Sequence, residues 1–189
     1  MSRSFRILES RAIAPLALGV ISATFATASA SAQPSPTKAP PATVTLTRLP
    51  CGTNAPPTDV GLRFSDTYAF SGVMVQLTYS CYLICHNDDY MIWDTGYAKG
   101  PAATAPKESL VEQLGHLSLT PANVKFVGIS HYHGDHVGQT ASFPQATLLI
   151  GKGDWEVITD PKLSGATNPA AFAPWVSGGS KAESLTTDK

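Results

Sequence analysis

The fold of this chain is decided by one stretch, VKFVGISHYHGDHVG, which occupies residues 124–138. Its first half, residues 124–130, is short, apolar and partly β-branched, which predicts a buried strand. Three histidines and one aspartate follow within six positions, a density that packing alone rarely requires. The stretch therefore predicts a chemically active loop at the point where a strand leaves the core.

The spacing of these side chains indicates metal binding. In an extended segment, residues i and i+2 point to the same side, about 6–7 Å apart, so His131 and His133 converge on one ion. A turn at Gly134 brings Asp135 and the adjacent His136 towards a second ion. Imidazole suits zinc, copper, iron or nickel, and a mixed His/Asp set without thiolates is typical of catalytic sites.

In these residues the chain resembles the metallo-β-lactamase-fold hydrolases, whose signature is His-x-His-x-Asp-His after a buried strand. The resemblance implies two zinc ions, one held by His131 and His133 and the other by Asp135 and His136, although other divalent metals would also suit these ligands. It implies hydrolysis of a lactone, lactam or related ester-like bond by activated water, with Asp135 holding or relaying a proton. The alternative is a histidine-rich surface loop that binds metal adventitiously.

The segments around the motif predict an α/β fold. Residues 73–85 and 90–93 form a predicted β-hairpin, residues 107–117 carry one apolar helical stripe, and residues 146–150 form a further strand. By resemblance this is a metallo-β-lactamase αββα sandwich that is incomplete, with its N-terminal half in residues 43–189. The resemblance covers about residues 60 to 155.

The sequence beyond the motif lacks the ligands that the family adds downstream. No histidine follows His136, whereas a catalytic zinc usually takes three protein ligands and a water. We therefore expect a truncated chain. The alternative function is a catalytically inactive fragment, or a metal-binding remnant without the distal ligands.

Histidines and an aspartate outside the motif have more than one interpretation. Asp94, in the Asp-Thr-Gly turn after the second hairpin strand, either orients a metal-bound histidine or bonds its own local backbone. His86 in the hairpin turn and His116 at a helix end are expected to face solvent.

Three cysteines permit a disulfide and leave one over. Cys81 and Cys85 lie about 13 Å apart along a predicted strand, too far for a bond. Cys51 can pair with either one. The favoured interpretation is that all three are small buried hydrophobic residues.

The N-terminal segment predicts export. Residues 1–32 have a basic start, an apolar centre and a small-x-small end, as in a secretory signal peptide. A proline-rich tether follows at residues 33–42. We expect a periplasmic or secreted protein with no stable membrane span after signal removal, and the alternative is an uncleaved anchor.

Charge and composition limit the partners. The 13 lysines and arginines nearly balance 14 aspartates and glutamates and form no cluster, so nucleic acid is excluded as a partner. A small-molecule substrate is expected. The Gly151–Trp155 stretch and the loop at Cys51 look similar to lactonase-like members of the family, with β-lactams the next choice. The sequence leaves the oligomeric state open.

Overall fold

The chain is described here by a computed structural model, which covers residues 42–186. The predicted signal peptide lies outside the described residues, as does the tether except for its last residue. The part of the chain that the structure describes contains no helix both long and apolar enough to cross a membrane.

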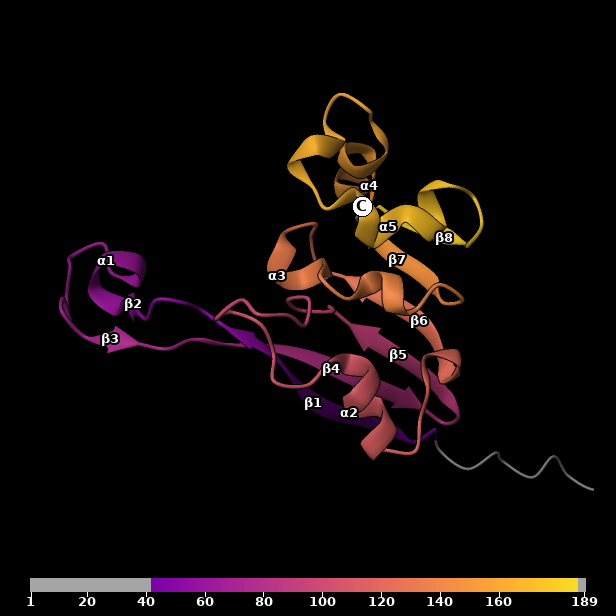
Figure 1. Cartoon of the computed structure of the whole chain (residues 1–189), viewed down its shortest axis with the longest axis horizontal. Coiled ribbons are helices and arrows are strands. Elements are labelled where there is room, and N and C mark those ends of the chain that lie inside the picture. The colour runs from indigo at the N-terminus through magenta and orange to yellow at the C-terminus, as the bar shows by residue number, and fades with distance from the viewer. Residues whose placement is uncertain (1–41, 187–189) are drawn as a thin grey trace, which may run out of the picture. The chain divides into compact units, whose positions relative to one another are not determined.

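A six-stranded mixed sheet forms the centre of the fold, in the order β1-β4-β5-β6-β7-β8 (Figure 1). The strands are β1 Val44–Thr53, β4 Thr78–His86, β5 Asp89–Trp93, β6 Val124–Ile129, β7 Thr147–Gly151 and β8 Ala182–Leu185. β1, β4 and β5 are antiparallel, whereas β5 to β8 run parallel. The carboxyl ends of β5, β6 and β7 therefore meet at one edge, which positions the motif.

Four helices lie along the chain between and after these strands. They are α2 Leu110–His116, α3 Gly134–Val137, α4 Lys152–Thr159 and α5 Pro169–Val176. Short 3₁₀ turns occupy Pro121–Asn123, Thr140–Ser142 and Ser164–Ala166. α2 begins where the sequence offers a capping box, since Ser109 and Glu112 bond each other's backbone N–H.

The hydrophobic core lies between the helices and one face of the sheet. Alternate strand residues such as Leu83, Ile92 and Val127 are buried in one cluster with Leu114 and Phe172 from the helices. The residues between them face the other way and are more exposed. The two-residue period of each strand thus selects one covered face.

A second, two-stranded sheet interrupts the chain between β1 and β4. It consists of β2 Thr58–Asp59 and β3 Met74–Val75, with α1 Val60–Phe64 following β2. Figure 1 shows these elements beyond the ends of β1 and β4. We call residues 55–76 the arm.

The structure corrects four sequence-based expectations. β1 continues through Pro50 to Thr53, where a loop was expected, because β1 is an edge strand and tolerates the missing N–H of proline. The single strand expected at residues 73–85 is broken into β3 and β4. Residues 182–185 form a strand, β8, although the end of the sequence carries no apolar run that would predict one.

The fourth correction concerns the cysteines. Cys51 and Cys81 are fully buried and form a disulfide with a Cα–Cα distance of 5.8 Å, so the favoured interpretation of three unpaired cysteines was wrong. Cys85 has a free thiol, and it forms no bond with Cys81, as the strand geometry predicted. The disulfide joins the edge strand β1 to β4 on the core side.

Candidate metal centre

The predicted ligands lie at the carboxyl end of β6. The motif leaves the strand after Ile129, and α3 begins at Gly134, so a sharp turn separates the first two histidines from Asp135 and His136. The expected turn at Gly134 is therefore the first turn of a short helix.

The structure brings all four motif side chains together. His131 Nε2 lies 3.1 Å from His133 Nδ1, and His136 Nε2 lies 3.4 Å from Asp135 Oδ2. The His131 and His136 rings are 4.0 Å apart between centroids. Two pairs of donor atoms thus stand side by side, one formed by His131 and His133 and the other by Asp135 and His136.

Asp94 holds His136 from the end of the neighbouring strand β5. Its Oδ2 accepts from His136 Nδ1 at 2.7 Å and from the Ser130 hydroxyl at 2.8 Å, and its Oδ1 accepts from the Ser130 N–H at 2.8 Å. Asp94 is only 7% exposed and has a φ of 55°. Of the two interpretations of Asp94, the contact with a histidine is the one observed. Its bond to His136 Nδ1 leaves Nε2 to face Asp135.

Close backbone contacts fix the turn after β5 against α3. The Thr95 N–H donates to His136 O at 2.6 Å, and the Gly138 N–H donates to Gly96 O at 2.7 Å. A Cβ at Gly138 would lie 2.3 Å from the N of Ala98, so no side chain fits there. The glycine after the motif is therefore a packing requirement of the site.

Residues outside the motif complete the site. Ser130 bonds Asp94 and lies 3.2 Å from His131 Nδ1. Asp154, in the first turn of α4, accepts the backbone N–H of Tyr132 within the motif at 3.1 Å. Sequence reasoning named neither role. The position of Asp154 just after β7 could have identified it as a site residue. The carboxyl ends of parallel strands meet at one edge of a sheet, and the motif lies at that edge too.

The two histidines outside the motif also lie outside the cluster. His86 is exposed at the end of β4, just before the turn to β5. His116 is exposed and lies 3.2 Å from a Glu108 carboxylate oxygen. The expectation that both face solvent is confirmed.

Burial changes the proton affinity of two side chains in this region. Desolvation, and then the neighbouring His136 and His133, lower the pKa of His131. This shift favours neutral imidazole, which is the form that binds metals. Desolvation, assisted by Tyr79, raises the pKa of the nearby Tyr97 to about 12.

The distance within each donor pair fits two of the four ligand positions around a tetrahedral zinc ion. Ligands bound at about 2.0–2.1 Å from a tetrahedral ion stand about 3.3–3.4 Å apart, close to the spacing within both pairs. Each pair supplies two ligands. Among residues 42–186, no group of three or more His, Cys, Asp or Glu side chains has the geometry to hold a metal ion.

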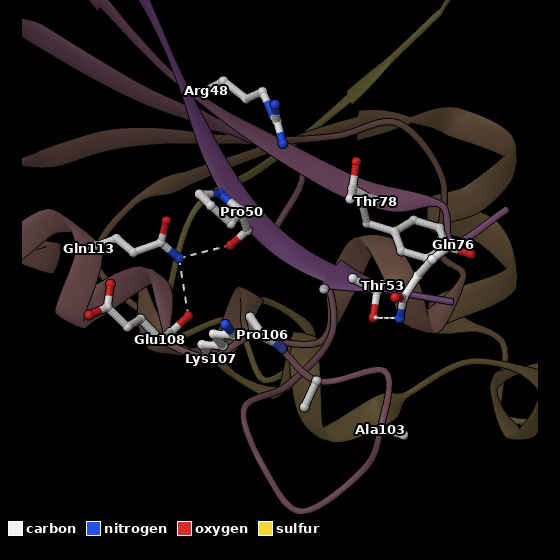
Figure 2. Close-up of a pocket in the computed structure, with 13 residues that line it drawn as sticks. Arg48, Pro50, Thr53, Gln76, Thr78, Ala103, Pro106, Lys107, Glu108 and Gln113 are labelled. Atoms are coloured by element: carbon white, nitrogen blue, oxygen red, sulfur yellow. Dashed lines mark hydrogen bonds between the residues drawn. The ribbon is translucent and has the colours of Figure 1, made fainter. Parts of the chain in front are cut away.

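A cavity of about 670 Å³ lies elsewhere in the described part of the chain (Figure 2). It runs beside the edge strand β1, between Arg48, Thr78 and the loop at Pro106. Gln113 donates to Pro50 O at 2.8 Å at its border. None of the four motif residues lines this cavity.

The fold and the motif define a class of protein: an α/β domain with a histidine-rich loop at the carboxyl end of a parallel strand. Residues 75–163 match the family model described as the metallo-beta-lactamase superfamily. This match agrees with the resemblance to the metallo-β-lactamase-fold hydrolases that the motif carries.

Curated relatives and solved structures agree with this assignment. N-acyl homoserine lactonase AttM of Rhizobium johnstonii is 30% identical over 108 residues, which is 48% of this chain and 41% of the relative. AttM of Agrobacterium fabrum is 37% identical over 54 residues, 29% of this chain and 20% of that protein. The matches span less than half the length of these relatives.

Among solved structures, a mutant of B. thuringiensis AiiA with bound N-decanoyl-L-homoserine has a TM-score of 0.55 and 17% identity. The match covers 76% of this chain and 60% of that one. The hydrolase AbOPH of the beta lactamase superfamily has a TM-score of 0.56 and 21% identity, over 77% of this chain and 60% of the other. These neighbours confirm the expected fold.

Proposed function

We propose that this chain carries the zinc-binding loop of a metal-dependent hydrolase that opens lactone rings. The observation that carries the proposal is the pairing of donor atoms in the motif, with His136 held by the buried Asp94. The AttM relatives, which are N-acyl homoserine lactonases, favour a lactone over a β-lactam.

Each motif side chain has a role in this proposal. His131 and His133 would hold one ion, and Asp135 and His136 a second. Bound zinc supplies activation of water near neutral pH and polarisation of the substrate carbonyl. Asp94 accepts from His136 Nδ1 and thereby leaves Nε2 free for the metal.

The protein framework contributes orientation and a proton acceptor. Asp154 fixes the backbone between the first two histidines through its bond to the Tyr132 N–H. Asp135 lies with its carboxylate beside His136 and can take up a proton from the attacking water. We assign to Asp135 both ligation and this proton transfer.

A second candidate function is metal binding without turnover. It is favoured by one observation: each donor pair in the described residues supplies two ligands, whereas a catalytic zinc usually has three. Under this alternative the chain retains the loop, and the remaining ligands are missing.

We also propose export to the periplasm or outside the cell. The Cys51–Cys81 disulfide supports it, because disulfides persist in oxidising compartments and are rare in the cytosol. The signal-like residues 1–32 point the same way.

Zinc titration of the purified chain, followed by hydrolysis assays, tests the proposal. His133→Ala should abolish tight zinc binding, whereas His116→Ala, which removes an exposed histidine outside the cluster, should leave it unchanged. An N-acyl homoserine lactone should be opened and a chromogenic cephalosporin left intact.

The outcomes separate the two candidates. Zinc binding that depends on His133 without hydrolysis of either compound would establish the second candidate. Zinc affinity that is equal in both variants would refute both, because the motif would then not be the metal site.

A further inference from the structure

Hydrogen bonds at the base of the arm and within it hold its backbone in place. At its base, Asn54 is only 9% exposed and ties both legs together: Nδ2 donates to the Thr58 hydroxyl at 2.7 Å and Oδ1 accepts the Leu77 N–H at 2.6 Å. Further out, Asp59 accepts the N–H groups of Leu62 and Gly72 at 3.2 and 2.8 Å. The arm is therefore an ordered element with a defined backbone.

The large apolar side chains of the arm point to solvent. Six of them are between 47% and 74% exposed. They are Leu62, Phe64, Tyr68, Phe70, Val73 and Met74. Together they expose on the order of 700 Å² of surface, given that a fully buried aromatic residue covers about 150–250 Å². Exposed apolar side chains concentrated within one short ordered segment mark an interaction surface.

The backbone at the tip of the arm is arranged to display two of these rings. Tyr68 and Phe70 have φ values of 54° and 63°, a region that bulky residues rarely adopt because it strains the backbone. Hydrogen bonds hold this shape, with the Ser71 N–H donating to Tyr68 O and the Val73 N–H to Phe70 O. Strain of this kind persists where a surface has a use.

We propose that the arm binds the arm of a second copy of this chain, forming a two-fold homodimer. The exposed apolar area is close to the roughly 800 Å² per partner that a standard stable interface buries. Such an interface must be self-complementary, because the same surface meets itself. The arm offers apolar side chains for such an interface, together with one cation, Arg63, and one carboxylate, Asp66, three positions apart in the sequence.

The net charge of the arm argues against a lipid surface as its binding partner. Residues 55–76 contain two aspartates and one arginine, which gives the arm a net negative charge. Helices that bind membrane interfaces instead carry lysines and arginines that attract anionic lipids.

Sedimentation equilibrium of the 189-residue chain over a wide concentration range tests the proposal. The wild-type chain should show a reversible monomer–dimer equilibrium. The double variant Phe64→Ser/Phe70→Ser should raise the dimer Kd at least tenfold. The matched control Leu117→Ser/Leu163→Ser removes two exposed apolar side chains outside the arm and should leave the Kd unchanged.

Met74→Glu gives a second, independent variant, which places like charges in the interface and should also raise the Kd. Circular dichroism and a count of one free thiol confirm that each variant is folded. A wild-type chain that is monomeric throughout would overturn the proposal, as would arm variants that associate like wild type. A monomeric chain that binds phosphatidylcholine vesicles through the arm would assign the surface to lipid instead.

Discussion

Removing the Cys51–Cys81 disulfide should destabilise the folded chain by a predictable amount. The bond links residues 30 positions apart. The loop-closure entropy of such a loop corresponds to about 3.6 kcal/mol at 25 °C. The double variant Cys51→Ala/Cys81→Ala should therefore lose roughly this much of its free energy of unfolding, a large share of the stability of an ordinary domain.

Urea unfolding followed by tryptophan fluorescence measures this loss. The slope of the free energy against urea should also rise, because an unfolded chain without the cross-link exposes more surface. Cys85→Ala is the matched control, since it removes a cysteine that forms no disulfide, and it should change stability far less. A loss below about 1 kcal/mol in the double variant would refute the reasoning.

Two further predictions concern the turn at the site. Gly138→Ala should destabilise the fold by about 1–3 kcal/mol or more, because its Cβ would overlap backbone atoms. Gly134→Ala, which meets nothing within 4 Å, should be tolerated, and thermal unfolding of both variants makes the comparison. Tyr97 should ionise late, because burial raises its pKa to about 12. Its contribution to stability is fully present below pH 10, the unfolded value, and is lost as the pH rises through about 12. Absorbance titration of wild type and Tyr97→Phe should show one late-ionising phenol that the variant lacks.

The sequence predicted the central parts of the fold because their signals are local. The apolar run before the motif and the α2 stripe each lie within a window of about ten residues, and the two hairpin strands follow each other directly in the chain. The spacing of the motif and one glycine likewise indicated that its four side chains would lie close together, while their role as metal ligands stays a prediction. Asp94 was identified as a candidate because a turn motif marked the end of its strand.

The parts that were missed depend on contacts between distant residues. The strand expected at residues 73–85 breaks near Leu77 because the Leu77 N–H bonds the side chain of Asn54, 23 residues earlier. β8 has no apolar run, and it forms because β7 offers it a parallel edge. The disulfide depends on the register that pairs Leu49 with Cys81, which spacing alone does not give.

The spacing of the ligands also affects how much a metal can stabilise the fold. His131 and His133 are two residues apart, so they are neighbours in the unfolded chain as well. The contact between Asp94 and His136 spans 42 residues and exists only after β5 and β6 have paired. A metal held mainly by the first pair would bind the unfolded chain too, and such binding reduces its stabilising effect. The rise in melting temperature with added zinc should therefore be smaller than the affinity of the folded chain alone implies.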